Sequence, residues 1–258
     1  MDVFVIAGGI PGPEDPLFPF AQGKPKALID VAGKPMAQWV LDAVSGAKHA
    51  DQVVIVGMDE DSGLHCDNPL HFVPDQGGML DNGMAGMKRV QEVNPSAVHA
   101  MVLPGDVPAI TSQMIDWRIQ SAEGSTADFD FTAIRRDVME ARYPESKRSY
   151  TKLKDVEVCG GDAHVLRLSL MADTDLWDRL IDSRKSIFKQ AALIGIDTLF
   201  LLLTRSITLK GAAKIVGKRL GIVAAATISP YAEMGMDADK PFQLEILREE
   251  LMTTGSKI

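Results

Sequence analysis

The chain has 258 residues, of which 46% are hydrophobic and 24% charged, a balance that favours one large folded domain and excludes a disordered chain. Its formal net charge of -8 at pH 7 repels polyanions and so excludes nucleic acid as an expected partner. Two cysteines without metal-ligand spacing favour a reducing, cytoplasmic compartment, and no apolar stretch reaches the ~20 residues that a transmembrane segment needs.

The first hundred residues predict alternating strands and helices. Short apolar runs bounded by Gly, Pro or Asp predict strands at 3–7, 53–56, 72–74 and 98–103. Residues 1–9 lead directly into the first run with no basic region or cleavage site, so we expect no signal peptide. Apolar side chains at helical spacing predict helices at 36–44 and 84–93. This alternation indicates a mostly parallel sheet with helices on both faces.

The second half predicts a more variable region inside the same single domain, 1–258. In chain order we expect a helix at 115–121, a strand at 129–134, a polar lid or acceptor loop at 137–154, a strand at 165–170, two or three helices in 175–220, a strand at 223–228 and a closing helix at 242–251. The most hydrophobic stretch, 191–203, is too short to span a membrane and predicts a buried helix. The variable acceptor and helical region is therefore placed at about 137–222.

A glycine-rich turn ends the first predicted strand, in the sequence Ala7-Gly8-Gly9-Ile10-Pro11-Gly12. Glycines allow backbone N–H groups to approach phosphate oxygens closely. The spacing differs from the dinucleotide fingerprint because prolines occupy the turn and no helix pattern follows at once. A phosphate loop and a simple Gly-Pro turn are both compatible with this segment alone.

The residues that follow point to a family. Pro25-Lys26-Ala27-Leu28 and Gly33-Lys34-Pro35-Met36 stand in the same register as the N-terminal signature of nucleotide-sugar pyrophosphorylases and related nucleotidyltransferases, which this segment resembles. The resemblance implies a three-layer α/β sandwich with a mostly parallel, Rossmann-like sheet, of the nucleotide-diphospho-sugar transferase or glycosyltransferase-A-like type. It also implies that Lys26 contacts the nucleotide phosphates, where a compact ammonium stabilises developing charge. The alternative is a solvated surface lysine.

The glycine loop departs from the family pattern. An arginine usually follows the glycines, whereas Pro16 stands near that register and the loop is longer. Lys24 or Lys34 could supply the missing charge, and the sequence does not decide between them. The resemblance otherwise assigns the nucleotide to the backbone of Ala7, Gly8, Gly9 and Gly12.

Two acidic segments predict a magnesium site. Asp106 directly follows a predicted strand, in Leu103-Pro104-Gly105-Asp106-Val107-Pro108, and magnesium usually takes one or two carboxylates beside water and phosphate oxygens. The Gly-Asp-x-Pro form resembles the metal-binding turn of molybdenum-cofactor nucleotidyltransferases, which implies that Asp106 holds Mg²⁺ and that Gly105 contacts the nucleotide. A turn-forming aspartate is the alternative.

The second segment lies far downstream, in Asp237-Ala238-Asp239-Lys240-Pro241 before the last predicted helix. It resembles the Asp-x-Asp-x-Pro segment that completes the family's metal site, which implies Asp239 as the second magnesium ligand and Asp237 after it. Acidic residues in this position also cap helices, so a structural role for one of the pair remains open.

Two further segments resemble ligand-binding loops of the family. Gln76 and Asn82, after the third predicted strand, are expected to read the nucleobase. Lys152, Gly160, Gly161 and Asp162 are expected to face the acceptor, with the glycine pair allowing its close approach. A plain loop role is equally open for each of these contacts.

Together the resemblances imply a magnesium-dependent nucleotidyltransferase whose partners are a nucleoside triphosphate and a small phosphorylated acceptor, a sugar phosphate or cofactor precursor. An acceptor oxygen attacks the α-phosphorus and pyrophosphate leaves on the opposite side. Two other functions stay open: a catalytically silent nucleotide-binding regulator, and a glycosyltransferase that consumes a nucleotide sugar. The nucleobase, the acceptor and the formation of a homodimer are left undecided.

Overall fold

A mixed β-sheet forms the centre of the protein in the computed structural model, which describes residues 1–183 and 195–255. Its strands are β1 (Asp2–Ile6), β4 (Val53–Val56), β5 (Leu70–Val73), β6 (His99–Pro104), β7 (Phe129–Arg135), β8 (Thr151–Lys152), β9 (Glu157–Gly160), β10 (His164–Arg167) and β11 (Ala224–Ser229). The order is β5-β4-β1-β6-β10-β7-β9-β8, with β11 parallel to β7. The strands β5, β4, β1 and β6 run parallel, so their carboxyl ends meet at one edge.

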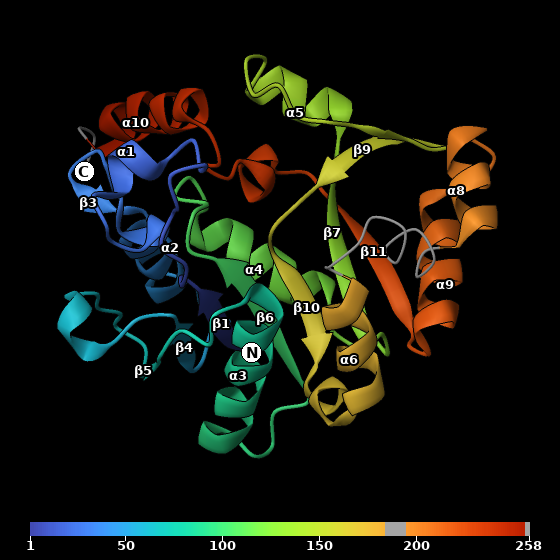
Figure 1. Cartoon of the computed structure of the whole chain (residues 1–258), viewed down its shortest axis with the longest axis horizontal. Helices are drawn as coiled ribbons and strands as arrows, with labels where there is room; N and C mark the ends of the chain where they lie inside the picture. The colour runs from blue at the N-terminus through green and yellow to red at the C-terminus, as the bar shows by residue number, and fades with distance from the viewer. Residues whose placement is uncertain (184–194, 256–258) are drawn as a thin grey trace.

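Helices cover both faces of the sheet (Figure 1). They are α1 (Phe18–Ala21), α2 (Met36–Ser45), α3 (Met79–Val93), α4 (Ser112–Ser121), α5 (Arg136–Arg142), α6 (Thr174–Ser183), α8 (Ile196–Leu203), α9 (Leu209–Leu220) and α10 (Pro241–Gly255). Alternate side chains of a strand point to opposite faces. Val3 and Val5 pack in the core that α2, α4 and α10 share, whereas Phe4 packs in the core of α3 and α6. The expected three-layer, mostly parallel α/β architecture is confirmed.

The sequence interpretation was wrong in part after residue 135. The polar segment 137–154 is not a continuous irregular loop, because α5 and β8 lie within it. An Arg136–Glu140 ion pair at i,i+4 supports α5, and Met139 is its one fully buried side chain, so the helix leaves little apolar periodicity to detect. The expected strand at 165–170 ends at Arg167 and continues as a 3-10 helix, Leu168–Ala172, and β9 was not predicted.

The apolar stretch 191–203 was expected to form a buried helix. Its residues 191–194 lie outside the described part of the chain, and α8 follows. Phe200 and Leu203 on α8 are 63% and 83% exposed, so burial of the whole helix is a wrong prediction. No helix in the described ranges combines the length and the apolar character that crossing a membrane requires.

A bulge separates β9 from β10. Both strands pair antiparallel with β7, but Ala133 is opposite Gly160 while Asp130 is opposite Val165, so two extra residues are inserted between the two ladders. The backbone N–H of Asp162 leaves the ladder and donates to Met234 O at 2.6 Å. The bulge thereby directs the backbone of Asp162 toward the segment that leads into α10.

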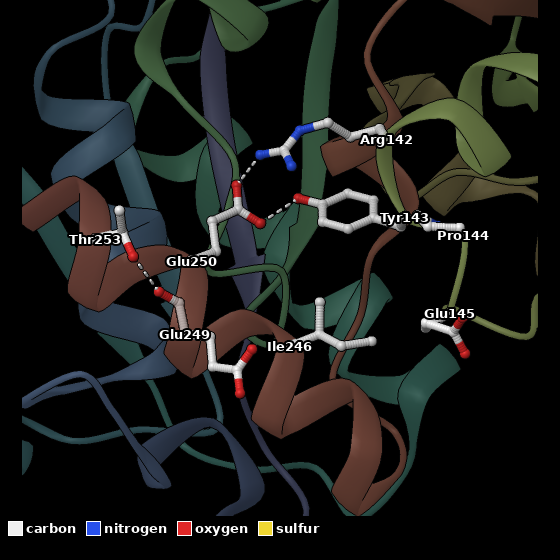
Figure 2. Close-up of a pocket in the computed structure, with 8 residues that line it drawn as sticks. All are labelled: Arg142, Tyr143, Pro144, Glu145, Ile246, Glu249, Glu250 and Thr253. Carbon is white, nitrogen blue, oxygen red and sulfur yellow. Dashed lines mark hydrogen bonds and ion pairs between the residues drawn. The ribbon is translucent and has the colours of Figure 1, made fainter.

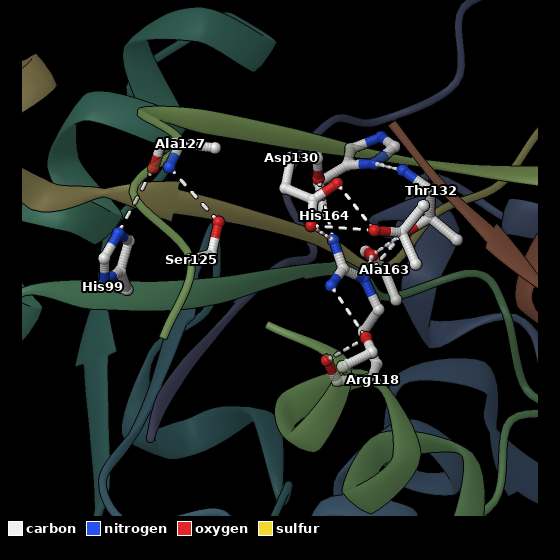
Figure 3. Close-up of polar contacts among 10 residues, drawn as sticks. His99, Arg118, Ser125, Ala127, Asp130, Thr132, Ala163 and His164 are labelled. Carbon is white, nitrogen blue, oxygen red and sulfur yellow. Dashed lines mark hydrogen bonds and ion pairs between the residues drawn. The ribbon is translucent and has the colours of Figure 1, made fainter. Parts of the chain in front are cut away.

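A fully buried arginine supports this bulge (Figure 3). Arg118 on α4 donates from Nε to Thr132 Oγ1 at 2.9 Å and to Ala163 O at 3.0 Å, and from Nη2 to Asp130 O at 2.9 Å. Its Nη2 also lies 3.2 Å from the carboxylate of Asp130, which accepts hydrogen bonds from Thr227 on β11. One guanidinium therefore joins α4, β7 and the bulge.

His164 lies directly after the bulge, and its lowered pKa should make the stability of the fold depend on pH. Burial and the charge of Arg118 lower its pKa to about 4, and its Nδ1 accepts from Thr132 N at 3.1 Å. A depressed histidine pKa means that the unfolded chain alone takes up a proton as the pH falls through about 6.5. The stability present above pH 6.5 is thus lost progressively toward pH 4, by about 1–2 kcal/mol at pH 5.

Urea unfolding of the wild type and of His164→Asn, at pH 7 and pH 5, measures this effect. The amide oxygen of asparagine keeps an acceptor for Thr132 N and removes the titration. We expect the free energy of unfolding to fall more steeply with acidification in the wild type than in the variant. Equal slopes in the two proteins would show that His164 titrates normally.

Candidate active site

The centre of the site is one lysine held between two carboxylates. Lys26 Nζ donates to Asp106 Oδ2 at 2.6 Å and to Asp239 Oδ1 at 2.5 Å. The aspartates lie 80 and 213 residues from Lys26 in sequence. Burial lowers the pKa of Lys26, but the charges of Asp106 and Asp239 and their hydrogen bonds outweigh it and hold the pKa above its usual value. Lys26 is therefore a fixed ammonium, and the fold brings the three residues together.

Local backbone structure explains how Lys26, Asp106 and Asp239 are positioned. Lys26 starts a 3-10 helix, Lys26–Leu28, and its backbone N–H donates to Gly9 O at 3.0 Å, which ties it to the glycine turn. Asp106 follows β6, and its carbonyl oxygen accepts from Ala238 N at 3.0 Å, which brings the segment before α10 alongside. Asp239 N donates to the Oε1 of Gln243 in α10 at 3.2 Å. Backbone bonds thus join the Asp106 turn to the segment before α10, and the Lys26 side chain joins that pair to the glycine turn.

A second acidic pair lies beside the first. Asp237 forms an ion pair with Arg148 through Nη1, and Arg148 Nη2 lies 3.5 Å from Gly160 O. Burial and a hydrogen bond with Asp239 raise the pKa of Asp237 to about 6, although Arg148 lowers it. Burial, together with the charges of Asp237 and Asp106, raises the pKa of Asp162 well above its usual value. Asp162 Oδ2 is buried and has no hydrogen-bond partner among the described residues.

The carboxylates of this site fit a magnesium ion that takes two protein ligands and completes its shell with water and phosphate oxygens. Nowhere in residues 1–183 and 195–255 do three or more His, Cys, Asp or Glu side chains form a group that could hold a metal ion. Magnesium, however, commonly takes only one or two carboxylates and completes its octahedron with water and phosphate oxygens. Asp106 and Asp239 reach the same ammonium, so the two carboxylates lie close enough to face one ligand. Asp237 instead faces Arg148, which favours Asp239 as Asp106's partner.

The predicted nucleotide-binding backbone lies at the carboxyl ends of β1 and β6. Gly8 lies against Asp75 and Asn82, since a Cβ on Gly8 would stand 2.6 Å from Asp75 Oδ1 and 3.0 Å from Asn82 Nδ2. A Cβ on Gly105 would stand 3.1 Å from the Cβ of Ala7. The loops after β1, β5 and β6 therefore meet at one place. Gly9 has φ +97 and Gly12 is exposed.

Gly57, which the sequence analysis did not identify, packs directly against the backbone of Gly8. It follows β4 with φ +95, and a Cβ there would stand 2.1 Å from Gly8 Cα and 2.2 Å from Gly8 N. Gly57→Ala should therefore displace the Gly8 backbone and add about 1–2 kcal/mol of left-handed strain. We expect a lower melting temperature and weaker triphosphate affinity. Gly63→Ala, at φ +75 with nothing within 4 Å of the added Cβ, is the matched control and should lower stability alone.

The two side chains expected to read a base differ in exposure. Asn82 is buried, and its amide is fully engaged: Oδ1 accepts from Gln76 N at 2.7 Å and Nδ2 donates to Asp75 Oδ1 at 2.7 Å. Asn82 thus shapes the loop after β5. Gln76 is exposed, with Nε2 donating to Pro74 O at 2.7 Å.

The other predicted cations lie apart from Lys26. Lys34 pairs with Asp42 at 2.7 Å and lies over the ring of Trp39. Lys152 faces Glu157 at 3.7 Å on the β8–β9 ladder. Lys24 is exposed. None of these contacts places a second lysine at the carboxylates. Arg148, which pairs with the neighbouring Asp237, was not predicted, because no motif marks the polar segment that contains it.

A surface hollow lies apart from these residues (Figure 2). It measures about 500 Å³ and lies between α5 and α10. None of its lining residues belongs to the cluster of Lys26, Asp106, Asp237 and Asp239, which we call the carboxylate site. Arg142 and the hydroxyl of Tyr143 both bond Glu250 there, which ties α5 to α10. Glu145 and Glu249 also line it, so its charge disfavours a triphosphate.

Parts of the chain match known proteins in sequence. Residues 21–177, more than half of the chain, match the family model described as MobA-like NTP transferase domain. The matched segment contains Lys26 and Asp106 and ends before Asp239. The bifunctional protein GlmU of Thermoanaerobacter pseudethanolicus is 29% identical over 106 residues, which are 40% of this chain and 23% of GlmU. The chain therefore aligns with less than a quarter of that relative.

Solved structures share the fold over nearly the whole chain. A hypothetical transferase from Thermus thermophilus is 29% identical, with a TM-score of 0.80 over 94% of this chain and 98% of that one. A CMP:2-keto-3-deoxy-manno-octonic acid synthetase complexed with CTP is 14% identical, with a TM-score of 0.58 over 100% and 99% of the two chains. A 4-diphosphocytidyl-2C-methyl-D-erythritol synthase from Anaerococcus prevotii is 13% identical, with a TM-score of 0.57 over 97% and 95%. The last two likenesses establish the fold alone.

Proposed function

The chain belongs to the MobA-like NTP transferase domain family, and from this premise we propose that it transfers a nucleoside monophosphate from a triphosphate to a small phosphorylated acceptor, releasing pyrophosphate. One observation carries the proposal: the Nζ of the mostly buried Lys26 lies 2.6 Å from Asp106 Oδ2 and 2.5 Å from Asp239 Oδ1. Two free cysteines, Cys66 and Cys159, agree with a cytoplasmic location.

Lys26 stabilises the negative charge that develops on the α-phosphate in this proposal. The Lys26 side chain is only 20% exposed, so its charge is partly shielded from water and is positioned before substrate binds. On nucleotide binding, Lys26 exchanges a carboxylate contact for an oxygen of the α-phosphate, where negative charge grows as the acceptor attacks. Asp106 and Asp239 would hold Mg²⁺, which would neutralise part of the triphosphate charge when bound.

The remaining residues position the two substrates. Backbone N–H groups of the turn through Gly8, Gly9 and Gly12 face the triphosphate, and Gln76 faces the base at the neighbouring loop. On the other side, Arg148 and the backbone of Gly160 and Gly161 face the acceptor phosphate. In this proposal Arg148 binds the acceptor phosphate in place of Lys152, because Arg148 pairs with Asp237 whereas Lys152 pairs with Glu157. Catalysis then depends on alignment and charge and needs no protein nucleophile.

Two measurements on the same protein test the proposal. Thermal shift with each of the four ribonucleoside triphosphates and Mg²⁺ identifies the base, since a ligand at 100 times its Kd stabilises by about 2.7 kcal/mol. Pyrophosphate release is then followed with that triphosphate and a panel of sugar, polyol and alkyl phosphates. We expect one triphosphate to stabilise and at least one acceptor to release pyrophosphate. Stabilisation with no release from the whole panel would instead favour the silent regulator. Consumption of a nucleotide sugar would favour the glycosyltransferase.

A further inference from the structure

An apolar cavity lies on the opposite side of the sheet from α2 and α4. It measures about 450 Å³, is partly open to solvent, and is lined by residues from β1, β6, β10, α3, α6 and the end of α9. Figure 1 shows α3 and α6 in front of these strands. Phe4, Leu166 and Trp177 are among the side chains that line it. Its polar groups are few: Asp162, His164 and the indole N–H of Trp177, which already donates to Leu170 O at 2.8 Å.

Asp162 joins this cavity to the carboxylate site. Its side chain lines the cavity, and its carboxylate lies within electrostatic reach of Asp106, Asp237 and Arg148. Its Oδ2 is buried with no hydrogen-bond partner among the described residues. Pro104, two residues before Asp106, also lines the cavity. The apolar space therefore begins where the proposed acceptor phosphate binds, and a polar group without a partner stands at the junction.

The size of the cavity sets the size of its occupant. A buried apolar cavity of about 150 Å³ holds one benzene ring, so a space three times larger accommodates on the order of ten to fifteen carbon atoms. Each methylene that leaves water for such a space stabilises binding, and an apolar space of this size is costly to leave exposed to water. A polar sugar would find almost no hydrogen-bond partners there.

We propose that the nucleotidyl acceptor is an amphiphile, a phosphate monoester of an aliphatic chain, whose chain enters this cavity while its phosphate lies at Asp162, Arg148 and the carboxylate site. The inference rests on the proposed function and names its acceptor class. A phosphate oxygen of the acceptor forms a new bond to the α-phosphorus. The bond from that phosphorus to the bridging oxygen breaks, and pyrophosphate leaves with the electron pair.

Binding of octyl phosphate and ethyl phosphate, measured by calorimetry and by tryptophan fluorescence, tests the chain-binding step without turnover. The two probes share the headgroup and differ in the chain. We expect octyl phosphate to bind at least tenfold more tightly to the wild type. Equal affinity for the two probes would overturn the inference. Octanol that binds as tightly as octyl phosphate would also overturn it, because the phosphate would then contribute nothing.

Gly83→Leu supplies the matching variant. Gly83 on α3 lines the cavity, and a Cβ added to it meets nothing within 4 Å, so a longer side chain starts in open space. Leucine also favours the helix over glycine. We expect the preference for octyl over ethyl phosphate to fall by about tenfold while ethyl phosphate affinity is unchanged. Lys88→Leu, on an exposed position of the same helix, is the control and should retain the preference.

Activity separates this inference from the proposed function. Pyrophosphate release that depends on octyl phosphate and is lost with Gly83→Leu supports both. Release with short or sugar phosphates alone, with no chain-length preference in binding, retains the transferase and overturns the amphiphilic acceptor. Tight, chain-length-dependent binding that Gly83→Leu weakens, with no release from any triphosphate, retains the amphiphile site and overturns the transfer reaction.

Discussion

Replacing Asp106 by asparagine is expected to lower the rate of pyrophosphate release by about 100–1,000-fold, because the variant loses a carboxylate charge that would hold Mg²⁺ against the triphosphate. Asparagine keeps the shape of the side chain and one oxygen acceptor. The carboxylate is 18% exposed and pairs with Lys26, which retains Asp239 as a second partner. The free energy of unfolding should therefore change by only about 1 kcal/mol.

Steady-state kinetics at saturating triphosphate, beside urea unfolding, measures both quantities. Asp51→Asn is the matched control, since its carboxylate is 67% exposed and pairs only with the chain's N-terminal ammonium among the contacts of the described residues. That control should retain full activity. An Asp106→Asn protein that keeps more than about a tenth of wild-type turnover would remove Asp106 from the reaction.

The second large effect concerns folding. Arg118→Met should lower the free energy of unfolding by about 3–5 kcal/mol, because it leaves the carboxylate of Asp130 buried without its cation. Arg118 is 0% and Asp130 4% exposed, and Ala163 O and Thr132 Oγ1 lose a donor as well. These groups form the bulge that positions Asp162. The loss should therefore also weaken acceptor binding in the molecules that remain folded.

Chemical denaturation of Arg118→Met at pH 7 gives the free energy of unfolding directly. Arg89→Met serves as the comparison, because Arg89 forms an exposed i,i+3 pair with Glu92 and should cost less than about 1 kcal/mol. A loss of under about 1 kcal/mol for Arg118→Met as well would show that the buried network adds no stability.

The parallel half of the sheet was predictable because each strand there is a short apolar run flanked by turn residues. Val53–Val56 is such a run, and β4 has those bounds. The proximity of the loops after β1, β5 and β6 followed from the same reasoning, since carboxyl ends of parallel strands share an edge. Lys26, Asp106 and Asp239 were named from motifs, and the fold places them in contact; their chemical roles remain predictions.

The rest depended on long-range geometry that composition does not encode. β9 and β10 are parts of one bent strand, and the bulge between them depends on Arg118, more than forty residues earlier. Arg148 lies in a polar segment with no periodicity, so nothing local distinguishes it from Lys152 or Lys154. The apolar cavity arises where α3, α6 and α9 fail to fill one face of the sheet, and its volume depends on how the helices pack.

A crystal structure of the chain with its preferred triphosphate and Mg²⁺ tests the central claim most directly. The account predicts an α-phosphate oxygen within hydrogen-bond distance of Lys26 Nζ, and one metal ion bound by Asp106 and Asp239 against the triphosphate. A triphosphate bound elsewhere, with Lys26 still joined to both carboxylates, would contradict it.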